Sequence, residues 1–134
     1  MSGKIEGGCL CGAVRYEVNS APEGVTHCHC RQCRVASGAP VVTWGYFKTA
    51  DIAFTKGEPS RFRSSSRAVR LFCPNCGSQI AFQEDAKPEI TDLTVGSMDE
   101  PGEVAPEEHV WTSERIGWFR LDDRLPRRPR GHGS

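Results

Sequence analysis

Three of the seven cysteines fall within six residues, in the run Cys28-His29-Cys30-Arg31-Gln32-Cys33. The other four form two pairs, Cys9 with Cys11 and Cys73 with Cys76. Tetrahedral zinc takes four thiolates in a closed structural site, whereas a catalytic zinc keeps three protein ligands and leaves the fourth position to water or substrate. The seven cysteines therefore divide naturally into a group of four and a group of three.

The two pairs have the features of metal-binding turns. The two-residue spacer between Cys73 and Cys76 turns both sulfurs towards one point, and the following Gly77 tolerates the positive φ that such a turn requires. The run from Cys9 to Gly12 looks like a tighter version that again ends in glycine. We predict a closed site that cross-links much of the fold, made of Cys9, Cys11, Cys73 and Cys76, and an open site made of Cys28, Cys30 and Cys33.

Other uses of the cysteines compete with this division. Disulfides fit poorly, because the count is odd, the spacings are short and the N-terminus lacks the apolar stretch of a secretion signal. An iron–sulfur cluster is a minor alternative, since the cysteines do not form a ferredoxin-like run. A further alternative is a second closed site, in which the three-cysteine group gains His27, His29 or His109. If residues 26–30 are extended, His29 points away from the face that carries Cys28 and Cys30.

Length and charge narrow the class of protein. A chain of 134 residues fits one domain with a modest core that bound metal would help to stabilise. Basic and acidic residues balance at 17 each, so no long-range field favours nucleic acid or membranes. No apolar run approaches the length of a transmembrane helix. We predict a cytoplasmic protein with no nucleic-acid or membrane partner, in a reducing compartment that keeps its thiols available for metal.

Short apolar alternations between frequent turn signals predict a mainly β, small antiparallel domain. Residues 31–36 are expected to form one or two helical turns, and 96–106 a loop. The basic tail, 126–134, is expected to be disordered, which leaves one zinc-binding domain over 1–125. Extended segments are expected at 12–18, 25–30, 41–47, 52–54, 61–63, 67–72, 79–82, 90–95, 109–111 and 117–119, with the Cys73 turn at the tip of the 67–82 hairpin.

A zinc ion held by three thiolates suits chemistry on a soft ligand. Two positive charges against three negative ones leave the open site formally anionic, which weakens its ability to acidify water. Zinc accepts sulfur readily, and a coordinating thiol is deprotonated outright. We therefore expect a substrate thiol to fill the fourth position as a thiolate, which attacks, or is released from, a small carbonyl carbon.

Further side chains are candidates for the site, and each also has an ordinary structural explanation. Arginines beside the three-cysteine group would offset its charge or hold a substrate carboxylate, or would simply lie in solvent. Aromatic residues in a strand would either wall a pocket or fill the core. A histidine would either carry protons near neutral pH or have a structural role, and an aspartate in a turn is common whatever its function. These candidates are Arg31, Arg34, Trp44, Tyr46, Phe47, Asp99 and His109.

The combined pattern resembles the glutathione-dependent formaldehyde-activating enzyme and centromere protein V family. The resemblance covers nearly the whole chain apart from the tail. It implies a β-tent fold similar to that of the Mss-type GTPase chaperones, a structural zinc in the four-cysteine group and a second zinc in the three-cysteine group. The residues that carry it are Gly8-Cys9-Leu10-Cys11-Gly12, Val14, Tyr16, Cys28-His29-Cys30-Arg31-Gln32-Cys33-Arg34, Phe72-Cys73-Pro74-Asn75-Cys76-Gly77-Ser78, Gly96-Ser97-Met98-Asp99-Glu100-Pro101, Pro106, His109, Val110, Trp111 and Trp118.

The namesake reaction of that family joins glutathione and formaldehyde as S-hydroxymethylglutathione. The resemblance therefore implies a zinc-dependent carbon–sulfur lyase with two zinc ions per chain, acting on an adduct of glutathione, or another small thiol, with formaldehyde or another aldehyde. The alternative is a non-catalytic zinc-binding protein-interaction module, marked by a closed second site and an exposed apolar patch. A zinc-ribbon nucleic-acid binder ranks third, since the balanced charge attracts phosphate weakly.

Overall fold

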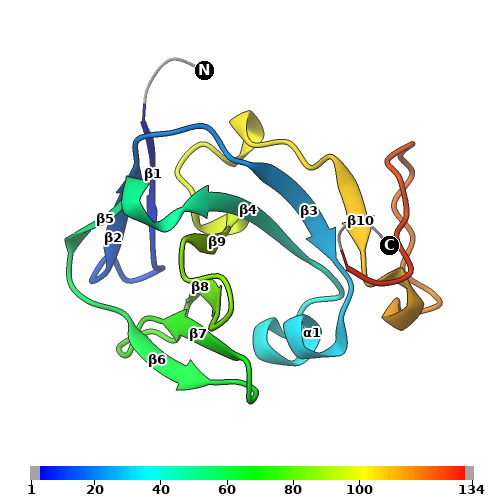
Figure 1. The fold of residues 1–134 in the computed structure, drawn as a ribbon, viewed down its shortest axis with the longest axis horizontal. Helices are drawn as coiled ribbons and strands as arrows, with labels where there is room; N and C mark the ends of the chain where they lie inside the picture. The colour runs from blue at the N-terminus through cyan, green and yellow to red at the C-terminus, as the bar shows by residue number, and fades with distance from the viewer. Residues whose placement is uncertain (1–3, 132–134) are drawn as a thin grey trace.

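The structure is a computed structural model that describes residues 4–131 (Figure 1). Within these residues lie ten strands, one short α-helix and four single-turn 3-10 helices. None of the helices among them is long and apolar enough to cross a membrane. In chain order the elements are β1 (Ile5–Gly8), β2 (Arg15–Val18), β3 (Gly24–Cys28), α1 (Arg31–Ser37), β4 (Val42–Lys48), η1 (Thr49–Asp51), β5 (Ile52–Lys56), β6 (Ser60–Arg63), β7 (Ala68–Phe72), β8 (Gln79–Glu84), β9 (Ile90–Thr94), η2 (Val95–Ser97), η3 (Pro101–Glu103), β10 (Glu108–Val110) and η4 (Thr112–Glu114).

The strands form two sheets, and both are visible in Figure 1. The smaller sheet has the order β1-β2-β5, and the larger has the order β10-β3-β4-β9-β8-β7-β6. Every strand pair is antiparallel except β10 with β3. The prediction of a mainly β, antiparallel domain is therefore confirmed.

The two faces of the large sheet bury different residues, because successive side chains of a strand point to opposite sides. One face packs into the main core, where Phe47 and Leu93 meet residues such as Tyr16 from the small sheet. The other face carries a second cluster, which includes Trp44 and Val42 and the cysteines that lead into α1. The three-cysteine group is thus built into a core of its own.

Local differences from the predicted elements have identifiable causes. The sequence pattern does not predict β1, because two of its four residues are glycines. The strand expected over 12–18 begins only at Arg15, since the preceding residues form a turn in which the Cys9 N–H donates to the Val14 carbonyl. The segment 117–119, expected to be extended, is a turn whose carbonyls accept hydrogen bonds from the Arg115 guanidinium.

The C-terminal segment follows β10. The backbone N–H of His109 donates to the Pro126 carbonyl at 2.7 Å, and that of Arg128 donates to the His109 carbonyl at 2.8 Å. Composition predicts disorder from residue 126. The described part of this tail, 126–131, instead makes these bonds, and 132–134 lie outside the described residues.

Candidate metal centres

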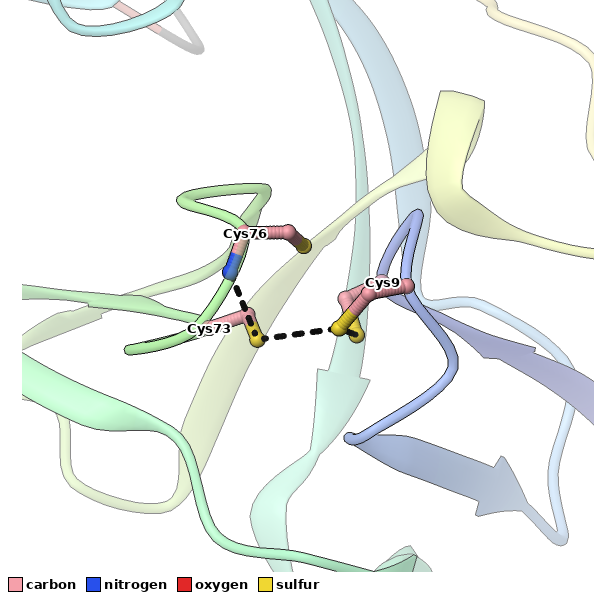
Figure 2. Close-up of side chains that lie close together, drawn as sticks. Cys9, Cys73 and Cys76 are labelled. Carbon is pink, nitrogen blue, oxygen red and sulfur yellow. Dashed lines mark hydrogen bonds between the residues drawn. The ribbon is translucent and has the colours of Figure 1, made fainter.

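Two turns that are distant in sequence bring four cysteines together. Figure 2 shows Cys9, from the loop after β1, facing Cys73 and Cys76, from the turn between β7 and β8. With Cys11, the four sulfurs all lie within 4.8 Å of one another. The Cys11 sulfur is 3.6 Å from that of Cys9 and 3.8 Å from that of Cys73. Zinc–sulfur bonds of about 2.3 Å in a tetrahedron place the sulfurs roughly 3.8 Å apart, so the four-cysteine group fits a zinc ion.

The backbone of both turns donates hydrogen bonds to these sulfurs. The N–H of Val14 donates to Cys9 Sγ at 3.2 Å, and those of Asn75 and Cys76 donate to Cys73 Sγ at 3.4 Å. Hydrogen bonds from the side chain and backbone of Ser78 lower the pKa of the Cys76 thiol. Because such bonds favour thiolate over thiol, they prepare the group for a metal cation.

The glycines that close the two turns have the conformation expected from sequence. Gly12 has φ +80° and Gly77 has φ +81°, both in the left-handed region that glycine enters without steric cost.

The remaining three cysteines lie where β3 leads into α1. Cys28 ends β3, Cys30 caps the helix by accepting the Cys33 N–H at 3.3 Å, and Cys33 lies in the first helical turn. Their sulfurs lie within 4.8 Å of one another, and those of Cys28 and Cys33 are 3.6 Å apart. All seven cysteines are free thiols, as a metal-binding interpretation requires and a disulfide framework does not allow.

Charge is unevenly distributed within the three-cysteine group. Hydrogen bonds with Cys30 and Cys33, together with burial, raise the pKa of Cys28. Hydrogen bonds from the other two thiols lower the pKa of Cys33, and the positive charge of Arg70 lowers it further. One thiol of the three is therefore the preferred anion, and a bound cation would be needed to hold all three as thiolates.

No fourth His, Cys, Asp or Glu among residues 4–131 joins the three-cysteine group. The three histidines considered as a fourth ligand gather elsewhere: His29 Nε2 is 2.8 Å from His109 Nδ1, and the rings of His27 and His109 are 4.9 Å apart. His109 Nε2 in turn lies 3.1 Å from the Asp123 carboxylate. Within the described part of the chain, the group thus consists of three cysteines alone.

The histidine network borders a pocket of about 390 Å³. His29 and His109, each 2% exposed, line it together with Arg115, Arg120 and Arg127. Burial, with a smaller contribution from the neighbouring His109, lowers the pKa of His29 to about 4. His29 is therefore neutral at physiological pH.

The family model of the glutathione-dependent formaldehyde-activating enzymes matches residues 4–114. The chain belongs to this family. The family resemblance predicted from the cysteine pattern is therefore confirmed.

Individual relatives agree with membership in the formaldehyde-activating enzyme family. An uncharacterized lyase of Schizosaccharomyces pombe (strain 972 / ATCC 24843) is 30% identical over 79 residues, which cover 59% of this chain and only 57% of the relative. A Halomonas elongata protein, provisionally named a glutathione-dependent formaldehyde-activating enzyme, is 26% identical over 129 residues, covering 90% of this chain and 82% of the relative. The crystal structure of a Rhodobacter sphaeroides protein is similar in fold, with a TM-score of 0.59 and 21% identity over 91% of this chain and 98% of that one.

Most of the other predicted site residues make contacts that stabilise the fold. The helix that carries Arg31 and Arg34 is tied to Glu114, whose carboxylate accepts the Arg31 N–H at 2.7 Å and whose carbonyl accepts from the Arg34 guanidinium at 3.4 Å. Asp99 forms an ion pair with Arg15. Trp44 and Phe47 are core residues on opposite faces of β4, and the Tyr46 hydroxyl bonds to that of Thr26.

Two residues near the sites carry no signal in the sequence. Arg70 alternates with apolar neighbours in β7, which suggests a solvent-facing side chain, yet it is 6% exposed and reaches Cys33. Asp123 lies in an irregular charged segment, and only the fold brings it to His109. Neither placement follows from local spacing.

Proposed function

We propose that this chain is a zinc-dependent carbon–sulfur lyase that joins a small thiol, such as glutathione, to formaldehyde or another small aldehyde. The observation that carries the proposal is that the cysteines gather as one group of four and one group of three, and that no fourth His, Cys, Asp or Glu of the described residues joins the group of three. Four thiolates make a closed structural site and three make a site that admits a substrate, so we propose two zinc ions per chain. Family membership supports a thiol as the substrate.

The roles of the residues follow from this division. Cys9, Cys11, Cys73 and Cys76 would hold a structural zinc ion, and Cys28, Cys30 and Cys33 a second one. Zinc bound at the second group would supply a centre at which a thiol loses its proton and is held as thiolate. The α1 cap orients the group, because the Cys30 sulfur accepts the Cys33 N–H while the Cys28 sulfur is fixed at the end of β3.

The reaction is a simple addition. The sulfur of the thiolate attacks the aldehyde carbon, a C–S bond forms, the C=O π pair moves to oxygen, and that oxygen takes up a proton. The reverse reaction returns the proton and breaks the C–S bond. Burial of Cys28 and Cys33 limits the access of bulk water to this step.

A non-catalytic protein-interaction module is less well supported. Its expected marks are a closed second site and one exposed apolar patch, but the three-cysteine group has no fourth ligand in the described residues.

The test is to count metal and thiol binding together. Elemental analysis of protein purified without chelator should find two zinc ions per chain, and Cys33→Ser should retain one. Cobalt-substituted wild-type protein should change its visible spectrum on addition of glutathione, whereas cobalt-substituted Cys33→Ser should not. Turnover of glutathione and formaldehyde is then measured against the uncatalysed addition. The proposal would be contradicted if wild-type protein held only one zinc ion per chain after zinc was added back. It would also be contradicted if no small thiol changed the visible spectrum of the cobalt-substituted protein.

A further inference from the structure

Arg70 is a buried cation without a conventional counter-ion. It lies in the middle of β7 and is 6% exposed. Arginine is almost never this buried unless it is paired, because removing a charge from water is costly. Among residues 4–131, however, no carboxylate forms an ion pair with Arg70, and its Nε and Nη1 groups are buried without a hydrogen-bond partner.

The polar contact that Arg70 does make is with the three-cysteine group. Its Nη2 lies 3.7 Å from Cys33 Sγ. Two aromatic rings position the guanidinium: its Cζ atom is 4.9 Å from the centre of the Phe82 ring and 6.0 Å from that of Trp44. Trp44 and Phe82 also belong to the apolar cluster that surrounds the cysteines.

Asp92 lies on the same face of the sheet and feels the positive charge of Arg70, but the two side chains form no ion pair. In the strand register Arg70 lies opposite Phe82, and Phe82 lies opposite Asp92, so an aromatic residue separates the two charged side chains. Burial raises the pKa of Asp92 to about 7, so this carboxyl is only partly ionised at neutral pH. The cysteine group is therefore the negative partner in direct contact.

We propose that Arg70 is a positioning residue that compensates the charge of the metal-loaded three-cysteine centre and makes its open position selective for anionic sulfur ligands. This inference rests on the proposed function. Three thiolates around one divalent cation leave one net negative charge, and a substrate thiolate adds a second. A fixed guanidinium in a region of low dielectric offsets this charge, whereas a neutral ligand such as imidazole needs no such help.

The test separates ligand charge from metal retention. Arg70→Met removes the charge and keeps an apolar side chain of similar length, Arg70→Lys keeps the charge, and Arg61→Met removes a charge from the exposed part of β6 as the matched control. Each protein is loaded with cobalt and titrated with glutathione and, separately, with imidazole, while the visible spectrum is recorded. Metal retention is measured by competition with a chelator, and the four-cysteine centre serves as the internal reference.

We expect Arg70→Met to weaken glutathione binding by about 10- to 100-fold, the range typical of lost outer contacts at metal sites, and to leave imidazole binding nearly unchanged. The chelator should remove metal from the three-cysteine centre first. Arg70→Lys and Arg61→Met should stay close to wild type.

Two results would overturn the inference. One is equal weakening of both ligands by Arg70→Met, which would indicate a packing role only. The other is a failure of Arg70→Lys to retain thiol selectivity, and this variant carries the test if Arg70→Met does not fold. A wild-type protein that binds no second metal would instead remove the proposed function, and the inference with it, before any Arg70 variant is compared.

Discussion

Asp123 holds the outer edge of a pair of buried histidines. An ionised carboxylate only accepts hydrogen bonds, so His109 Nε2, 3.1 Å away, must be the donor. The other ring nitrogen of His109, Nδ1, lies 2.8 Å from His29 Nε2, so one of these two nitrogens donates to the other. His29 Nδ1 is buried without a partner among the described residues.

We predict that Asp123→Asn removes a pH-dependent part of the stability. Partial burial alone would raise the pKa of Asp123, but hydrogen bonds from Arg127, the Leu125 N–H and His109 together lower it to about 2. A carboxyl group with a lowered folded-state pKa stabilises the fold above its unfolded pKa near 4, and this contribution is lost as the pH falls from about 4 to about 2.

The measurement is thermal or denaturant unfolding between pH 7 and pH 2. Asp123→Asn should be less stable than wild type at pH 7, and the difference should shrink as the pH falls below about 4. Asp122→Asn, at the exposed neighbouring position, is the control and should follow the wild-type curve. A constant difference at all pH values would show that Asp123 does not act through its charge.

At the scale of elements, β1 depends on a close approach of backbone and side chain. Gly7 lies opposite Tyr16 in the small sheet and bridges to Met98. A Cβ atom at Gly7 would collide with the Tyr16 hydroxyl and would lie 2.6 Å from the Ser97 carbonyl oxygen. That hydroxyl is itself fixed at 2.7 Å from the Ser97 hydroxyl, so it cannot move without losing this bond.

We predict that Gly7→Ala destabilises the protein by about 1–3 kcal/mol, the usual cost of overpacking a tightly packed position. Gly102→Ala is the matched control, because a Cβ atom there meets nothing within 4 Å. Both variants are compared with wild type by denaturant unfolding. Equal stability of Gly7→Ala and Gly102→Ala would show that β1 relaxes without cost.

The elements also show what local sequence can and cannot predict. Alternating apolar residues and turn signals predict most strands of the large sheet, including the hairpin with Cys73 and Cys76 at its tip, because these are local patterns. The sequence pattern does not predict β1, because pairing with β2 rather than the strand propensity of its own residues holds it in the sheet. The buried position of Arg70 depends on neighbours from three other segments, which no single window of sequence contains.

On the scale of the whole molecule, the two cysteine groups differ in what they connect. The three-cysteine group spans six residues and joins the end of β3 to the start of α1. The four-cysteine group joins positions 62 residues apart, Cys11 and Cys73, and so links the small sheet to the β7–β8 hairpin. Sequence spacing predicts each turn, because each turn is local, and the count of cysteines predicts how the turns are grouped; the fold brings the two distant turns together.

This difference predicts unequal effects of metal loss. Cys76→Ser would break the long-range cross-link made by the proposed structural zinc. Most of the folding free energy that such a zinc supplies, on the order of 10 kcal/mol in small zinc domains, should then be lost. Cys30→Ser removes a ligand from a short local loop and should lower the melting temperature far less. A strong chelator, which removes both metals, should lower the stability of wild-type protein at least to that of Cys76→Ser, and restored zinc should recover only the wild type. Equal melting temperatures of the two serine variants would mean that the four-cysteine group does not hold the sheets together, and that packing between Tyr16, Phe47 and Leu93 suffices.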